Sequence, residues 1–93
     1  MLNILVVEDD KNLRKLMTAV LLKNNYNVLT AEDGIKALDI MESSHVDLLI
    51  SDIMMPNMDG YELTGLIRDA NYTLPILMIT AKETLDDKKK GFS

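Results

Sequence analysis

Short apolar runs alternate with amphipathic segments along this sequence, and that alternation limits the folds open to it. Apolar runs of strand length lie at residues 4–7, 28–30, 46–50 and 74–79. Between them, apolar residues recur at three- and four-residue spacing, which is typical of helices with one buried face. Strands that alternate with helices form parallel βαβ units with right-handed crossovers. We therefore expect an α/β fold built on a parallel sheet.

Three helices are expected between these strands. The first follows Asp10, a favoured N-cap residue, and ends at residues 24–25. The second follows a turn at residues 32–34, and the third begins at residues 59–60; a weaker helical pattern covers residues 82–90. The apolar residues expected on the buried helix faces are Leu13, Leu16, Met17, Val20, Leu21, Ile35, Leu38, Met41, Tyr61, Leu63, Leu66, Ile67 and Ala70.

Composition excludes several classes of protein. With 93 residues the chain makes one small domain at most. Its net charge of −5 argues against nucleic-acid binding by this segment, and the absence of cysteine excludes disulfides and thiolate metal sites. There is no signal-peptide pattern and no apolar run approaching the roughly 18 residues needed to span a bilayer. We expect a soluble, cytoplasmic domain that does not enter a membrane.

Acidic residues follow the predicted strands at the points where these end. Asp52 closes the third apolar run, and a loop marked by Pro56 comes next. Glu8 and Asp9 follow the first run, and Thr80 follows the fourth. Because the carboxyl ends of parallel strands share one edge of the sheet, we expect these residues to meet there.

The chemistry of that edge has a functional and a plainer interpretation. Three converging carboxylates repel one another unless a cation balances their charge, and hard oxygen ligands suit Mg²⁺. A divalent ion beside a nucleophilic Asp and a hydroxyl is the equipment for phosphoryl transfer. The plainer interpretation makes Asp52 a turn cap and residues 8–10 a polar loop. Their joint placement at matching strand ends favours the first interpretation.

Three motifs resemble the receiver domain of two-component response regulators. They are VVEDD at residues 6–10, DIMMPNMDG at residues 52–60, and Thr80-Ala81. The resemblance covers the whole chain, and the spacing between the motifs fits. It implies a flavodoxin-like, doubly wound parallel sheet with strand order 2-1-3-4 and helices on both faces. It also implies two-component signal transduction by a switch that is not an enzyme in the usual sense.

The resemblance implies roles for the acidic residues. Asp52 would accept a phosphoryl group from a phosphohistidine on a sensor histidine kinase. Asp9 would bind Mg²⁺ directly, and Glu8 would do so mostly through water. Asp52 itself and the backbone carbonyl of Met54 would complete the protein ligands of the metal.

The same resemblance gives roles to the third motif and to the chain's output. Thr80 would be the switch hydroxyl that hydrogen-bonds a phosphoryl oxygen, and the small Ala81 would leave the phosphoryl group room to enter. The wording of residues 86–92 is similar to receivers that precede a winged-helix DNA-binding domain. A transcriptional output, with DNA binding by the full-length protein, is therefore expected.

Receivers of this family also carry a fifth strand and a fifth helix, with a Lys and an aromatic residue that belong to the switch. This sequence stops at Ser93, before those could occur, so we expect residues 1–93 to be a receiver truncated at its C-terminus, without an effector domain. The fourth strand would then be an exposed edge, and apolar surface near Leu13, Met17 and Val20 would be uncovered. We expect self-association through that surface, and phosphorylation slowed on the order of a hundredfold.

Two other functions compete with the phosphorylated switch. One is an interaction or oligomerisation module, or a folding fragment with an incomplete site, that is never phosphorylated. The other is a phosphatase of the haloacid-dehalogenase type, which also uses a nucleophilic Asp and Mg²⁺. That family needs a second acid two residues after the nucleophile, where this chain has Met54. The phosphatase is therefore set aside, and the interaction module is kept as the alternative.

Overall fold

The computed structural model describes residues 1–79 of the chain, and Thr80, Ala81 and the helical pattern at residues 82–90 lie outside the described residues. Strands and helices alternate through the described part, as the sequence predicts. They are β1 (Asn3–Val7), α1 (Lys11–Lys23), β2 (Asn27–Ala31), α2 (Gly34–Ser43), β3 (Leu48–Asp52), α3 (Gly60–Asp69) and β4 (Ile76–Ile79). None of the helices within residues 1–79 has the length and apolar character that crossing a bilayer requires.

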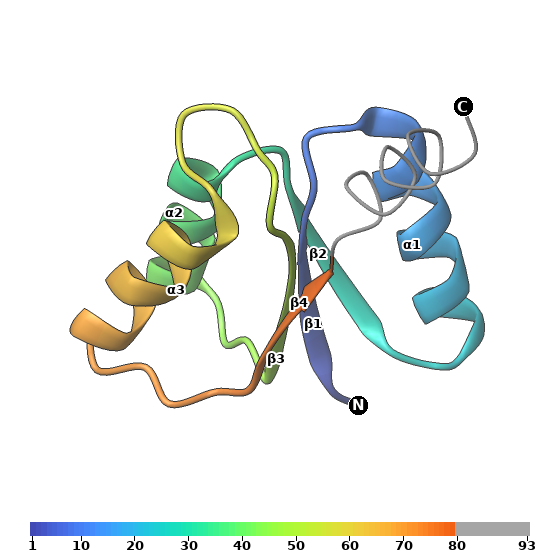
Figure 1. Ribbon diagram of the computed structural model, residues 1–93. Helices are drawn as coiled ribbons and strands as arrows, with labels where there is room; N and C mark the ends of the chain where they lie inside the picture. The colour runs from blue at the N-terminus through green and yellow to red at the C-terminus, as the bar shows by residue number, and fades with distance from the viewer. Residues whose placement is uncertain (80–93) are drawn as a thin grey trace, which may run out of the picture.

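The four strands of the described part form one parallel sheet in the order β2-β1-β3-β4. Helix α1 covers one face of this sheet, and α2 and α3 cover the other (Figure 1). This is the doubly wound arrangement and the strand order predicted from the sequence. From β1 the chain adds β2 on one side and then β3 and β4 on the other, so the strand order reverses between β1 and β3. In folds of this kind ligands bind at that switch point, beyond the carboxyl ends of the strands.

Residues of the central strands alternate between two apolar cores. On the side of α2 and α3 the buried residues are Leu5, Val7, Ala31, Ala37, Met41, Val46, Leu49, Leu63 and Ile67. On the side of α1 they are Ile4, Val6 and Ile50, with Met17 and Leu21 packed against them. Burial on both faces explains why β1 reads as an unbroken apolar run.

The buried faces of the helices differ from the prediction in part. Leu63, Ile67 and Met41 are buried as expected. Helix α2, however, also buries two small residues: Ala37 packs in the core, and Gly34 lies against the side chain of Met58. Other apolar residues expected on buried faces are exposed, and for these the prediction is wrong: Leu16, Ile35, Tyr61, Leu66 and Ala70. Val20 is exposed too, in agreement with the expectation that the apolar surface around it is uncovered.

Each helix within residues 1–79 begins with an aspartate at its N-cap. The side chains of Asp10, Asp33 and Asp59 each accept a hydrogen bond from the backbone N–H three residues on, at 3.0, 2.8 and 2.8 Å. Such caps are each worth about 1 kcal/mol of helix stability. The predicted cap at Asp10 and the predicted start of the third helix are both confirmed, and the caps hold all three βα loops at the carboxyl edge of the sheet.

Candidate functional site

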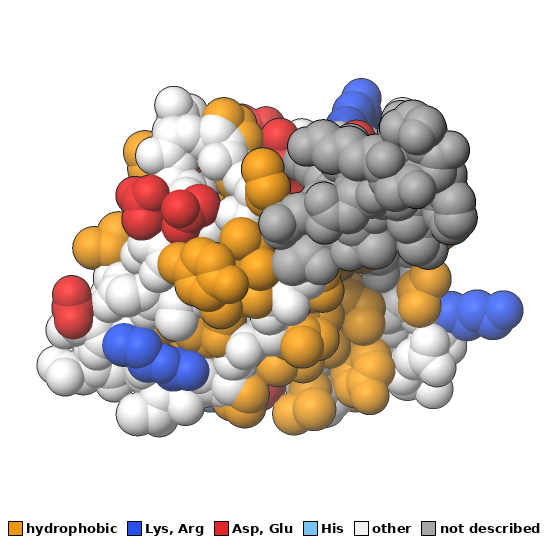
Figure 2. All heavy atoms as spheres, in the orientation of Figure 1, with side chains coloured by type: hydrophobic (Ala, Val, Ile, Leu, Met, Phe, Trp, Pro, Cys, Tyr) orange, Lys and Arg blue, Asp and Glu red, His pale blue; other side chains and the backbone are white. Residues whose placement is uncertain are grey.

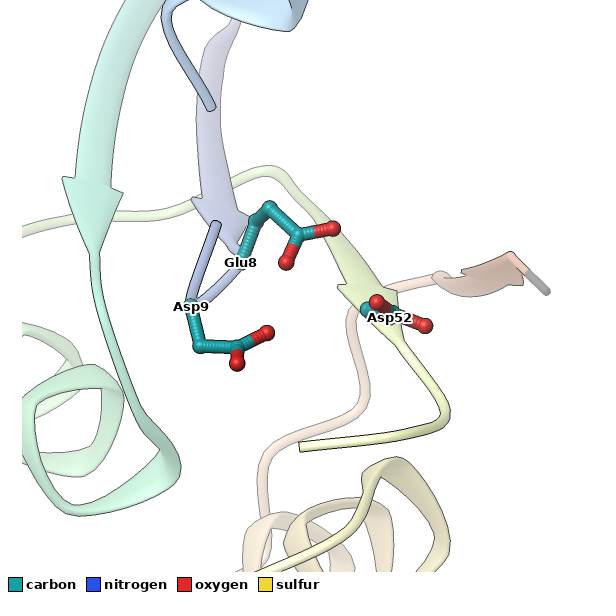
Figure 3. Close-up of side chains that lie close together, drawn as sticks. All are labelled: Glu8, Asp9 and Asp52. Atoms are coloured by element: carbon teal, nitrogen blue, oxygen red, sulfur yellow. The ribbon is translucent and has the colours of Figure 1, made fainter. Parts of the chain in front are cut away.

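Three carboxylates meet at the carboxyl edge of the sheet. Asp52 is the last residue of β3, and Glu8 and Asp9 directly follow β1. The side chains of Glu8 and Asp9 extend toward the end of β3 (Figure 3). One carboxylate oxygen from each of the three residues lies within 4.8 Å of the others. Glu8 and Asp52 are wholly buried, and Asp9 is partly exposed.

The pairing register of the sheet explains this proximity. Val7 of β1 pairs with Ser51 of β3, so the next residue of each strand, Glu8 and Asp52, come side by side. On the other side of β3, Asp52 pairs with Ile79 of β4, and the N–H of Ile53 donates to the carbonyl of Ile79 at 3.0 Å. A shift of one residue in either ladder would turn a carboxylate to the other face of the sheet.

A hydrogen bond from a nearby backbone N–H orients two of the three carboxylates. The backbone N–H of Asp10 donates to Glu8 Oε2 at 2.9 Å, and the N–H of Met54 donates to Asp52 Oδ1 at 3.1 Å. In both cases the donor lies two residues after the acid, and for Asp52 this is the pattern of an Asx turn. Both turns leave the strand end with its carboxylate already directed, before any ligand binds.

The loop after Asp52 is held against the start of α3. The N–H of Gly60 donates to the carbonyl of Ile53 at 2.9 Å. A Cβ atom at Gly60 would lie 2.8 Å from the carbonyl oxygen of Asp52 and 3.0 Å from Ile53 Cα, so no side chain fits there. Met54 lies in this loop with its side chain exposed; the metal-binding role of its carbonyl stays a prediction.

The donor set fits a hard divalent cation. Three carboxylate oxygens lie close together, and two of the residues are shielded from water, so a cation bound among them would be attracted with little screening. Carboxylate oxygens are the ligands that Mg²⁺ and Ca²⁺ prefer. A hollow of about 400 Å³ lies at the opposite edge of the sheet, lined in part by Asp47, Tyr72 and Leu74, and so is separate from this cluster.

The model of the response regulator receiver domain matches residues 4–93 of the chain. This chain belongs to that family. It is 41% identical over 87 residues to the sensor histidine kinase RcsC of Escherichia coli. The matched residues make up 94% of this chain and 9% of RcsC. It is 39% identical over 92 residues to the heme response regulator HssR of Staphylococcus epidermidis, 99% of this chain and 41% of HssR. The chain thus spans less than half of the length of these relatives.

Solved receiver structures have the same fold. The response regulator TrrA of Thermotoga maritima, in complex with Mg²⁺ and BeF, is 41% identical with a TM-score of 0.82, over 87% of this chain and 70% of TrrA. The receiver domain of the Francisella response regulator 1452 is 27% identical with a TM-score of 0.83, over 99% of this chain and 76% of that one.

One contact of this receiver's site was not expected from the sequence. Arg14, in the first part of α1, donates from Nη1 to the backbone oxygen of Glu8 at 2.7 Å. Arg14 stands six residues after Glu8, with a turn and a helix start between them, so no periodic pattern points to it. The only sequence signal is a basic side chain in the first helical turns after an acidic run.

Proposed function

We propose that Asp52 accepts a phosphoryl group from the phosphohistidine of a sensor histidine kinase and so acts as the switch of a cytoplasmic two-component system. One observation carries the proposal. Asp52 ends β3 beside the end of β1, with carboxylate oxygens of Glu8 and Asp9 within 4.8 Å of its own. TrrA, which is 41% identical to this chain, has been solved with Mg²⁺ and BeF and also with the histidine kinase ThkA, and both complexes support it.

The proposed reaction is a single in-line displacement. A carboxylate oxygen of Asp52 attacks the phosphorus, the P–N bond of the donor breaks, and the imidazole, protonated on its other nitrogen, leaves as a neutral ring with the electron pair of that bond. The N–H of Met54 holds the attacking carboxylate in orientation through Oδ1. Because Asp52 is wholly buried, side chains at the rim must move aside for the donor to reach it.

We propose Mg²⁺ as the cofactor, held by Glu8, Asp9, Asp52 and the carbonyl of Met54. When bound, the ion neutralises charge on the phosphoryl oxygens, which is the main requirement of phosphoryl transfer. The chain's own contribution is to hold the carboxylates together at the strand ends, and the burial of Glu8 and Asp52 strengthens their attraction for a cation.

We further propose that the phosphorylated residue is a signal and not a step of turnover. Receiver domains of this kind control an output, and the similarity of residues 86–92 to receivers that precede a winged-helix domain supports a transcriptional one. Thr80 directly follows β4 in the sequence, which supports its proposed role as the hydroxyl that responds to the phosphoryl group.

Acetyl phosphate tests the acceptor directly. In the presence of Mg²⁺, the intact mass of the chain should rise by one phosphoryl group, and the label should be lost in base as an acyl phosphate is. Asp52→Asn should abolish the gain. Asp47→Asn, which neutralises an aspartate at the other end of β3, should leave it intact. Equal labelling of the wild type and Asp52→Asn would overturn the proposal.

A second proposal concerns an apolar groove on the α1 side of the sheet. It encloses about 330 Å³ and is lined only by apolar residues, namely Leu16, Met17, Val20, Leu21, Ile50, Leu77 and Ile79. Hydrophobic side chains gather over this part of the molecule in Figure 2. Within residues 1–79, β4 pairs with β3 alone and is an edge of the sheet. Such a surface favours association with another chain, and we propose that a second copy covers it.

Sedimentation at micromolar concentration tests this association. The wild type should sediment as a dimer or larger species. Leu77→Lys, which places a charge in the groove, should shift it toward monomer. The matched control is Leu66→Lys, at an exposed leucine of α3 outside the groove, and it should behave as the wild type. A folded, monomeric wild type would refute this proposal and leave the first one unaffected.

A further inference from the structure

The turn between β1 and α1 is held from two sides by Arg14. Its guanidinium Nη1 donates to the carbonyl oxygen of Glu8 at 2.7 Å, and its backbone N–H donates to the carbonyl oxygen of Asp10 at 2.9 Å. The side chain of Arg14 is partly buried, so its hydrogen bond to the Glu8 carbonyl is partly shielded from solvent. The segment closed by these bonds contains two of the three carboxylates of the site.

The bond to Glu8 acts on Asp9 through the peptide plane. The carbonyl of Glu8 belongs to the rigid peptide unit that joins Glu8 to Asp9. Fixing the direction of that carbonyl therefore fixes the orientation of the plane and the position of the Asp9 Cα atom. Asp10 N–H, which donates to Glu8 Oε2 at 2.9 Å, is the next donor along the same turn. A free carbonyl at Glu8 would allow the plane to rotate and both carboxylates to move.

We propose that Arg14 is a positioning residue of this receiver: by clamping the carbonyl of Glu8 it directs the carboxylates of Glu8 and Asp9 toward Asp52. In this role Arg14 is a ligand of neither the metal nor the phosphoryl group and acts through the turn. The inference rests on the proposed function only in taking Mg²⁺ as the ligand of the three carboxylates.

If Arg14 acts through its charge, its removal has the opposite effect on Mg²⁺ affinity from the one expected if it acts through its hydrogen bond to Glu8. A guanidinium close to a cation site repels the cation, so its removal strengthens Mg²⁺ binding if charge is all that matters. If the clamp matters, its removal disorders two ligands and weakens binding. Groups that orient metal ligands through a hydrogen bond typically change metal affinity about 10–100-fold. The sign of the change therefore separates the two roles.

The experiment is a Mg²⁺ titration followed by amide NMR shifts. Arg14→Met removes the charge and the donor, and we expect it to weaken Mg²⁺ binding about tenfold or more. Arg14→Lys keeps the charge and a donor that is one bond shorter, and it should recover part of the affinity. Lys15→Met removes the same charge from the exposed next residue of α1 and should bind Mg²⁺ as tightly as the wild type or more tightly. Equal affinities for Arg14→Met and Lys15→Met would overturn the inference.

Two further measurements keep the inference testable if a variant or the metal fails. If Arg14→Met does not fold, the wild type suffices: by linkage, Mg²⁺ should strengthen the clamp and slow hydrogen exchange of the Arg14 guanidinium, and unchanged exchange would contradict the role. If the wild type binds no Mg²⁺, the proposed metal is wrong. The clamp is then judged without metal, by faster exchange of the Asp10 N–H in Arg14→Met and a smaller increase in Arg14→Lys. Equal exchange in the two variants would refute it.

Discussion

At Gly60 the start of α3 lies directly against the backbone of the acceptor strand. A Cβ atom there would meet two backbone atoms, the Asp52 oxygen at 2.8 Å and Ile53 Cα at 3.0 Å, and backbone cannot move aside as a flexible side chain can. The close approach brings the Gly60 N–H to the Ile53 carbonyl and so holds the loop that carries Met54. The glycine is required here for its size.

Two Gly→Ala substitutions in α3 should therefore have opposite signs. Gly60→Ala should lower the free energy of unfolding by about 1–3 kcal/mol, the usual cost of overpacking, and should weaken Mg²⁺ binding by moving the loop. Gly65→Ala, where a Cβ atom meets nothing within 4 Å, should raise it by about 0.5–1 kcal/mol, because alanine favours helix. Urea denaturation measures both, and a stabilising Gly60→Ala would show that the contact is not tight.

At the scale of the elements, the amino ends of β1 and β3 are joined through Asp47. Asp47, just before β3, accepts a hydrogen bond from the backbone N–H of Asn3 at 2.8 Å and contacts His45 Nε2 at 2.7 Å. The backbone N–H of Asp47 returns a bond of 2.8 Å to the Asn3 carbonyl. The bond from Asn3, followed by that from His45, lowers the pKa of Asp47 below its ordinary value of 3.8.

This pKa shift predicts a loss of stability in acid. A carboxyl group whose pKa is lower in the folded state stabilises the protein above its unfolded pKa, and the stabilisation is lost as the pH falls through the folded value. Between pH 4 and pH 2, Asp47→Asn should therefore lose less stability than the wild type. Asp39→Asn, at an exposed aspartate of α2, should lose as much as the wild type. Parallel curves of unfolding free energy against pH for the wild type and Asp47→Asn would contradict the assignment.

The elements that could be predicted are those with local signals. Apolar runs gave the four strands to within two residues, and the cap at Asp10 with the turn signals at residues 32–34 and 59–60 gave the helix starts. The convergence of Glu8, Asp9 and Asp52 on one edge also follows from parallel strands, but their separation depends on the register of Val7 with Ser51, which no local pattern specifies. The helix faces were partly wrong because close packing of α2 selects small residues, burying Ala37 and exposing Ile35.

For the whole molecule, three carboxylates lie together at one edge, and two of them are wholly removed from water, which costs free energy on folding. A cation that binds only the folded chain relieves that cost and stabilises the fold by mass action. The three carboxylates lie at the ends of β1 and β3, the two central strands, and these strands contribute residues to both apolar cores. A cation bound there would therefore stabilise the centre of the fold. Metal binding and global stability should therefore be coupled.

Mg²⁺ should raise the free energy of unfolding of this receiver, by about 1.4 kcal/mol for each tenfold increase in Mg²⁺ above its dissociation constant. Asp9→Asn, which removes one ligand at the partly exposed position, should flatten that dependence, whereas Asp39→Asn should keep it. Thermal unfolding with increasing MgCl₂, at constant ionic strength set with NaCl, measures the slope. Because constant ionic strength removes general screening, a wild type whose unfolding temperature does not respond would mean that the three carboxylates hold no Mg²⁺.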